Sequence, residues 1–160
     1  MKKIKRWLIL RDFLNDPKRC ALRLLSYRSR SRKEIFDRLK RKGFPVTEIE
    51  STIHFLENAG FISDEALTKE LLKYSVERKS LGKKGVEAFL TKRGIDRELI
   101  HKELSGYTKD IEAESAARFA KKKLKSINKY PKEIIRRRIW GMLQRRGFSA
   151  EIIHKTLDGL

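Results

Sequence analysis

The sequence predicts an all-α protein in which three tandem three-helix repeats form an elongated, curved array. Three observations carry this prediction: a short motif that occurs three times, abundant helix-capping residues, and a lack of the alternating Val/Ile/Thr-rich runs typical of strands. The motif is a basic pair followed by a glycine and a large apolar residue, and its glycines are Gly43, Gly94 and Gly147. Their intervals of 51 and 53 residues are typical of one structural unit used repeatedly.

Five apolar positions keep the same distance from this glycine in all three copies, at −8, −4, +1, +6 and +10. They are occupied by Ile35, Leu39, Phe44, Ile49 and Ile53, then by Val86, Leu90, Ile95, Ile100 and Leu104, and then by Ile139, Leu143, Phe148, Ile153 and Leu157. The spacing of four before and after the glycine is helical, so we expect these columns to form the core of each repeat.

The repeats are expected at 16–60, 61–107 and 108–160, after an N-terminal extension at 1–15. Residues 1–14 could be a packed helix or an extended segment, and we expect a helix. The helix links within each repeat are short enough for compact units.

In the first repeat, Asp16 is placed to cap a helix that has Pro17 at its first position. The second helix opens with a capping box from Ser31 to Glu34 and ends at Gly43, where a glycine permits the left-handed conformation. A second capping box is expected over 47–50, opening a third helix that ends near residue 60.

The other two repeats follow the same plan. In the second we expect helices from Ser63 to about Lys79, from the break at residues 81–82 to Gly94, and from a cap at Asp96 to about Leu104. In the third we expect them from about Lys109 to Ser126, from Pro131 to Gly147, and after a cap at Ser149.

The charge balance is strongly basic, with 40 Lys and Arg against 21 Asp and Glu, a net charge of +19. Residues 1–60 carry +9, residues 61–108 carry +2 and residues 109–160 carry +8. This distribution favours an extended contact surface over a single basic tail. Such a charge attracts polyanions or acidic protein surfaces at long range.

Several classes of function are disfavoured. Cys20 is the only cysteine, which excludes an intramolecular disulfide, and we expect it to be a buried apolar residue. Neither a metal-ligand spacing nor a catalytic constellation is present, and the run from Gly82 to Gly85 lacks P-loop spacing, so we expect no enzyme activity and no cofactor. The apolar run near the start stops at Leu10, too short for a signal peptide or a membrane span, so we expect a soluble, cytoplasmic protein.

The helix from Pro131 to Gly147 illustrates the candidate site. Its apolar residues share one face and leave Arg137, Arg138 and Arg145 on the other. One interpretation is a row of cations for phosphates or carboxylates; the other is compensation of the helix dipole together with solvation of the surface. The full set of candidate partner- or DNA-binding residues is Arg41, Lys42, Lys92, Arg93, Lys121, Lys122, Arg137, Arg138, Arg145 and Arg146.

The aromatic residues, Trp140 among them, stand at repeat-core spacings, so we expect them to pack in the core and not to stack on bases. His101 and His154 share position +7 after their glycines, which suggests a common role on the helix surface.

An ordered series of short motifs resembles the RecX family of bacterial regulatory proteins, which modulate the RecA recombinase. The similarity covers about residues 17–160, and the motifs lie at 21–35, 55–65, 78–82, 90–95, 116–117 and 143–148. Where the family usually has a Phe-Ala pair, the chain has Ala66-Leu67.

The resemblance implies a non-enzymatic regulator that binds RecA filaments on DNA and suppresses their ATPase, strand-exchange and coprotease activities. It implies a monomer, with the RecA filament as partner. The alternative is direct, sequence-nonspecific binding of single- or double-stranded DNA through a basic helical face. The triplets have the outline of a helix-turn-helix, but no helix carries the Asn, Gln and Arg cluster suited to reading base edges.

Overall fold

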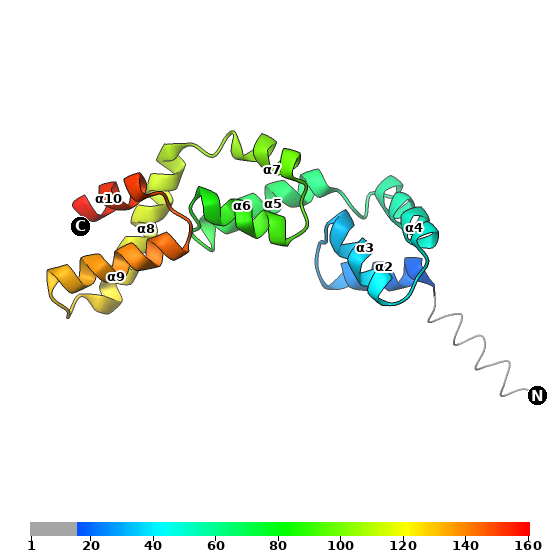
Figure 1. Ribbon diagram of the computed structural model, residues 1–160, viewed down its shortest axis with the longest axis horizontal. Helices are drawn as coiled ribbons and strands as arrows, with labels where there is room; N and C mark the ends of the chain where they lie inside the picture. The colour runs from blue at the N-terminus through cyan, green and yellow to red at the C-terminus, as the bar shows by residue number, and fades with distance from the viewer. Residues whose placement is uncertain (1–15) are drawn as a thin grey trace, which may run out of the picture. The chain divides into compact units, whose positions relative to one another are not determined.

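The computed structural model describes residues 16–160, and this part of the chain is all α-helical (Figure 1). Its helices are α2 Pro17–Tyr27, α3 Arg32–Arg41, α4 Val46–Asn58, α5 Asp64–Glu77, α6 Lys83–Lys92, α7 Arg97–Leu104, α8 Lys109–Ile127, α9 Lys132–Arg145 and α10 Ala150–Asp158. The predicted class, an all-α helical repeat, is confirmed. The expected extension at 1–15 and its helix lie outside the described residues.

The chain divides into two compact units, which we call the N-terminal unit (residues 1–67) and the C-terminal unit (residues 68–160). The boundary falls within α5. In the N-terminal unit α2, α3 and α4 pack on one another. In the C-terminal unit α6 packs on α7, and α8, α9 and α10 pack on one another. The division into three repeats at 16–60, 61–107 and 108–160 stays a prediction.

The repeated apolar columns form the cores. All fifteen residues at positions −8, −4, +1, +6 and +10 are buried, and none is more than 8% exposed. In the N-terminal unit the core also takes in Ala21, Leu56 and Ile62, with the half-buried Cys20 packed against it. The periodicity of the sequence thus identified the residues that remove apolar surface from water in every repeat.

Most helix starts follow the predicted caps. The Asp16 side chain accepts a hydrogen bond from the Lys18 N–H at 3.0 Å. At α3 both bonds of the capping box form: Ser31 Oγ accepts from the Glu34 N–H at 3.1 Å, and Glu34 Oε2 accepts from the Ser31 N–H at 3.3 Å.

The capping box predicted over 47–50 is wrong. Helix α4 already begins at Val46, with Pro45 as its N-cap and no side-chain capping bond. Proline has a preset φ, here −59°, that suits the residue before a helix, so α4 begins there with no side-chain cap for the N–H groups of its first turn. Thr47, the expected cap, therefore lies inside the first turn.

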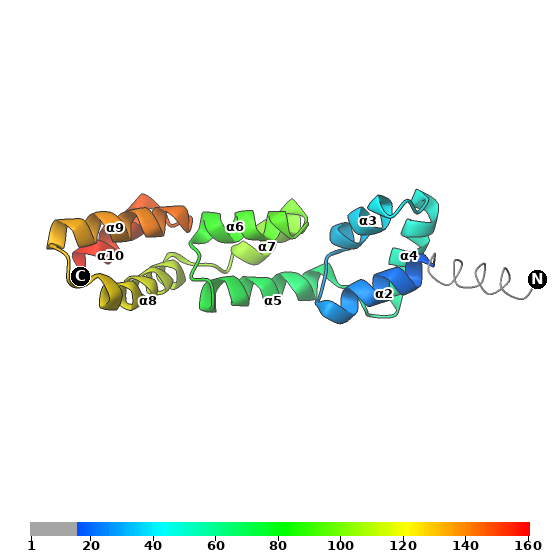
Figure 2. The ribbon, with the colours of Figure 1, turned by 90° about the horizontal axis from the view of Figure 1, so that it is seen from below.

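Two long-range bonds fix the loop between α5 and α6 in the C-terminal unit. The buried Glu112 of α8 accepts a hydrogen bond from the Lys83 N–H at 2.9 Å and so caps the start of α6 from a distant helix. The Tyr107 hydroxyl donates to the Leu81 carbonyl at 2.9 Å. Figure 2 shows α5 beside α6, where the rings of Tyr74 and Phe89 lie 6.4 Å apart.

The same loop meets the end of α9. The Gly82 N–H donates to the Arg146 carbonyl at 3.0 Å. A Cβ on Gly82 or Gly85 would collide with the backbone of residues 146–148, so the approach requires glycine at both positions. These contacts set the position of the last repeat glycine, Gly147, within the C-terminal unit.

Candidate functional site

The candidate cations stand at helix ends built in the same way three times. After α3, α6 and α9 the glycine takes a positive φ, of 90° at Gly43, 74° at Gly94 and 80° at Gly147. The next N–H then bonds back to the carbonyl of the leucine at −4, at 3.3, 3.2 and 3.3 Å in chain order. This is the Schellman arrangement, in which an apolar residue after the glycine packs on the last turn. The basic pair precedes this turn, so each repeat presents it in the same local geometry.

The first member of the pair, at position −2, is exposed in every repeat. Its three residues are Arg41, Lys92 and Arg145. Arg41 Nε donates to the Asp37 carbonyl of its own helix at 3.2 Å. Within the described residues, Lys92 and Arg145 make no hydrogen bond or ion pair with another side chain. Position −2 therefore presents a cation to solvent in each copy.

The second member, at position −1, differs between the copies. Lys42 is exposed, whereas Arg93 and Arg146 are partly buried. Lys42 also borders a recess that Cys20 and Tyr27 line. Position −1 is basic in all three copies of the sequence, but its side chain is exposed in the first copy and partly buried in the other two.

Arg146 is engaged inside the C-terminal unit. Its guanidinium donates to the Lys79 and Ser80 carbonyls, the second at 3.5 Å, and its Cζ lies 4.2 Å from the centre of the Phe119 ring. Burial lowers the pKa of the Arg146 guanidinium below its ordinary value. Arg146 thereby holds the α5–α6 loop against α8 and α9.

The arginines of α9 lie as the helical period predicts. Ile139 and Leu143 are buried, while Arg137 and Arg138 are exposed. Arg138 lies over the Tyr130 ring, with its Cζ 3.9 Å from the ring centre. This contact leaves the guanidinium edge available while restricting the side chain.

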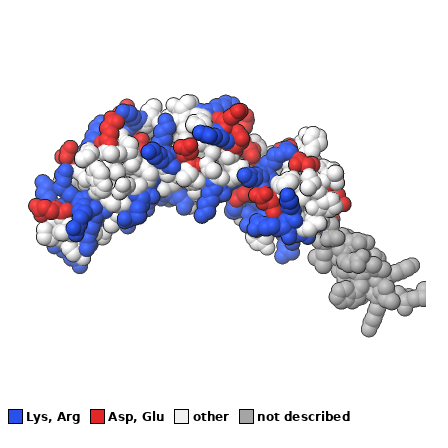
Figure 3. Space-filling view, viewed as in Figure 1, with Lys and Arg blue, Asp and Glu red and all other residues white. Residues whose placement is uncertain are grey.

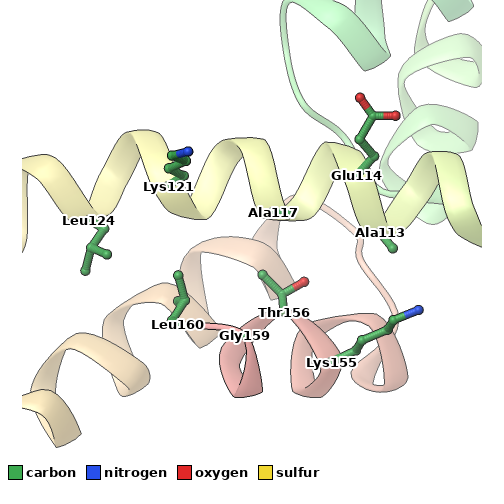
Figure 4. Close-up of a pocket in the computed structure, with 9 residues that line it drawn as sticks. All are labelled: Ala113, Glu114, Ala117, Lys121, Leu124, Lys155, Thr156, Gly159 and Leu160. Atoms are coloured by element: carbon green, nitrogen blue, oxygen red, sulfur yellow. The ribbon is translucent and has the colours of Figure 1, made fainter.

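One lysine of α8, Lys121, borders a groove. Lys121 and Lys122 are exposed, and Lys121 lines a cavity of about 570 Å³ between α8 and α10 (Figure 4). The cavity is lined by Ala113, Glu114, Ala117, Lys121, Leu124, Lys155, Thr156, Gly159 and Leu160. The acidic Glu114 shares this lining with two lysines, so the groove has less cationic character than the end of α9.

Several acidic side chains are paired with cations outside the candidate set. The pairs are Arg28–Glu34, Arg32–Glu50, Arg32–Glu57, Lys109–Glu151 and Arg136–Asp158, at 2.6 to 3.1 Å. Figure 3 shows Lys and Arg side chains spread over the visible face of both units, with fewer Asp and Glu among them. The acidic residues of these five pairs thus offset cations outside the candidate set.

The described residues contain no group of three or more His, Cys, Asp or Glu arranged to hold a metal ion. Among the helices of residues 16–160, none has the length and apolar character required to cross a bilayer. The chemistry that the site offers is the recognition of anions by exposed guanidinium and ammonium groups.

Two contacts near this surface were missed from the sequence. Arg136 donates to the Leu157 carbonyl at 2.7 Å and so ties α9 to the end of α10. Trp140, expected in the core, is only partly buried, and its ring lies 4.7 Å from that of His154. The equal spacing of Trp140 and His154 from Gly147, at −7 and +7, is a signal that could have paired them.

Models of a known family match both ends of the described chain. The model of the first three-helix domain of RecX matches residues 18–56, and that of the third three-helix domain of RecX matches residues 110–157.

Similar proteins carry the same family name. The chain is 36% identical over 140 residues to the regulatory protein RecX of Bacillus licheniformis, covering 86% of the chain and 52% of that protein. It is 31% identical over 140 residues to that of Clostridioides difficile, covering 88% of the chain and 66% of the relative. The chain thus spans about half the length of the Bacillus relative.

The fold is likewise similar to solved structures. The crystal structure of RecX from Lactobacillus salivarius matches with a TM-score of 0.76 and 26% identity, covering 93% of this chain and 97% of the other. A second crystal structure of a regulatory protein RecX matches with a TM-score of 0.74 at 23% identity, which supports the fold.

Proposed function

The chain belongs to the RecX family, and from this premise we propose that it regulates the RecA recombinase by binding its filament on DNA. The proposed effect is inhibition of the filament's ATPase, strand-exchange and coprotease activities, and hence control of recombination, DNA repair and the SOS response. We propose that the protein acts without catalysis of its own, as a monomer in the cytoplasm.

The observation that carries the proposal is the exposed cation at position −2 of every repeat. Arg41, Lys92 and Arg145 each stand just before the same glycine corner, on a chain with a net charge of +19. A filament presents the same protein and phosphate surface at regular intervals, so a protein that repeats its own cations can meet it at several points. Contacts linked in one chain strengthen each other through effective concentration.

The remaining candidates add to this surface in different degrees. Arg137 and Arg138 extend it along α9, and Lys42, Arg93, Lys121 and Lys122 add positive charge near the repeated corners or on α8. Charge of this kind speeds the approach to a polyanionic partner and sets its orientation more than it determines affinity.

The test is capture of RecA by the immobilised protein, with and without single-stranded DNA and a nucleotide that maintains filaments. We expect capture in both cases and more of it from filaments. Capture that requires DNA and persists when RecA is replaced by an unrelated single-strand-binding protein would contradict a RecA-specific partner.

Direct DNA binding is the second candidate, and the exposed cations of α9 favour it. Such binding would depend on salt, with the logarithm of affinity falling by about 0.7 per neutralised phosphate for each unit of log salt on single strands. An assay of the RecA ATPase on single-stranded DNA separates the two functions. A protein that only binds DNA has no need to bind RecA, so it should not act on the filament through RecA.

A further inference from the structure

A small recess lies between α9 and α10, outside the repeated cation column. It has a volume of about 240 Å³ and is lined by Arg136, Arg137, Trp140, His154 and Leu157. All five residues belong to the C-terminal unit. This space has room for one planar ring or one side chain.

Two aromatic rings form one side of this recess. The Trp140 and His154 ring centres lie 4.7 Å apart, with an angle of 69° between their planes. Trp140 is half-buried and packs against the core of α8, α9 and α10, whereas His154 is exposed. The edge contact with His154 and the packing below hold the indole in place, so a ligand ring would meet a fixed partner.

The two arginines of the recess are in different states. The Arg136 guanidinium is held by the Leu157 carbonyl at 2.7 Å and by Asp158 at 3.1 Å. Arg137 is exposed and, within the described residues, makes no hydrogen bond or ion pair. One cation is therefore part of the wall, and the next is available for an anion beside the rings.

We propose that this recess binds one base of a single-stranded nucleic acid, with the base against Trp140 and an adjacent phosphate on Arg137. A fixed aromatic ring next to a cation is the combination that single-strand-binding proteins use, because every base has a stacking face and every linkage a negative charge. A carboxylate side chain of a partner protein would use Arg137 but gain little from the rings. The combination of the two thus favours a nucleotide.

The recess is particular to the last repeat. The positions equivalent to Trp140 and His154 hold Phe36 and Glu50 in the first repeat, and Glu87 and His101 in the second. Neither pair joins two aromatic rings. One base-binding recess of this composition is therefore expected in the part of the chain that the structure describes, and its occupancy does not depend on RecA.

Tryptophan fluorescence tests the proposal on the full chain without RecA. Replacing Trp7 by Phe leaves Trp140 as the single tryptophan. Titration with a short oligo(dT) at low salt should quench its emission. An abasic oligomer of the same length, with the same phosphates and no bases, should bind more weakly and quench little. Equal quenching by both oligomers, or none by either, would overturn the proposal.

Substitutions separate the ring from the charge. Trp140→Leu should lower oligo(dT) affinity about tenfold, leave abasic binding unchanged and retain the helical circular dichroism. Trp140→Phe, which keeps a ring, should retain most of the oligo(dT) affinity. If the leucine variant does not fold, the affinity of Trp140→Phe is compared with that of the wild type instead. Arg137→Gln should weaken binding of both oligomers, and more than Lys69→Gln, which removes an exposed charge from α5. Unchanged oligo(dT) affinity in a folded Trp140→Leu protein would refute the site, and a partner peptide would then be the occupant to consider.

Discussion

The guanidinium of Arg146 lies over the ring of Phe119, with its Cζ 4.2 Å from the ring centre. The same guanidinium donates to carbonyls of the α5–α6 loop, while its neighbour Arg145 is exposed. Adjacent arginines in the repeated basic pair thus have separate roles. Arg146 bonds within the C-terminal unit, and Arg145 is exposed to solvent.

Substituting the two arginines should show this separation. Arg146→Ala leaves the loop carbonyls without their donor and uncovers Phe119, so we expect a loss of about 2 kcal/mol in the free energy of unfolding. Arg145→Ala should change it by less than about 0.5 kcal/mol, because the side chain is exposed. Urea unfolding followed by circular dichroism measures both, and equal losses would contradict the assignment.

Two glycines at the same repeat position should respond differently to alanine. Gly43 has a φ of 90° with open space where a Cβ would stand, so Gly43→Ala should cost only the left-handed backbone penalty, about 1 kcal/mol. Gly147 has a φ of 80°, and its added Cβ would collide with the Gly85 backbone. Gly147→Ala should therefore cost about 3 kcal/mol or more.

Thermal unfolding of the two glycine variants provides the comparison. The fall in Tm should be larger for Gly147→Ala. A similar fall for both would mean that the close approach of Gly147 to the α5–α6 loop does not persist in solution.

The buried apolar positions of the repeats could be predicted from the sequence. Positions such as Leu39, Leu90 and Leu143 are buried in every copy because helical spacing and glycine-terminated helix ends are local rules that a sequence displays directly. The prediction of a capping box over 47–50 was wrong for a local reason too, because α4 begins at Val46, directly after Pro45.

The features that the sequence did not predict depend on contacts between residues far apart in the chain. Nothing local indicates that Glu112 caps α6, or that the glycines at 82 and 85 give room for Gly147. Nothing local indicates either that Arg146 donates to the loop carbonyls at residues 79 and 80, while Arg145 beside it is exposed. The role of the ten candidate residues in binding a partner stays a prediction.

The cap that Glu112 gives to α6 should be measurable. Glu112→Ala leaves the Lys83 N–H without its acceptor and should lower the free energy of unfolding by about 1 to 2 kcal/mol. Glu112→Gln keeps an acceptor oxygen and should cost less. Hydrogen exchange at the first turn of α6 would report the change locally, and equal protection in wild type and Glu112→Ala would contradict the contact.

Tyr107 should make stability depend on alkaline pH. Burial raises the pKa of its hydroxyl from 10.0 to about 12, so between these values the unfolded chain loses a proton that the folded chain retains. The contribution is fully present below pH 10 and is lost as pH rises toward 12, up to about 3 kcal/mol.

The matched variant is Tyr107→Phe, because lysines also titrate in this range. It should be less stable than wild type near neutral pH, where the bond to the Leu81 carbonyl is lost, and the difference should shrink or reverse above pH 10. A difference that stays constant from neutral pH to pH 12 would contradict the burial of the hydroxyl.

We propose that exposed cations of the repeats regulate a RecA filament, and the RecA ATPase on single-stranded DNA measures this effect directly. Wild-type protein should suppress the activity. Arg41→Glu, Lys92→Glu and Arg145→Glu combined should suppress it less with helical content unchanged, whereas a matched reversal at the exposed Lys69, Lys73 and Arg78 should act nearly as wild type does. An ATPase unaffected by wild-type protein at concentrations that bind bare DNA would show that the protein does not regulate the filament.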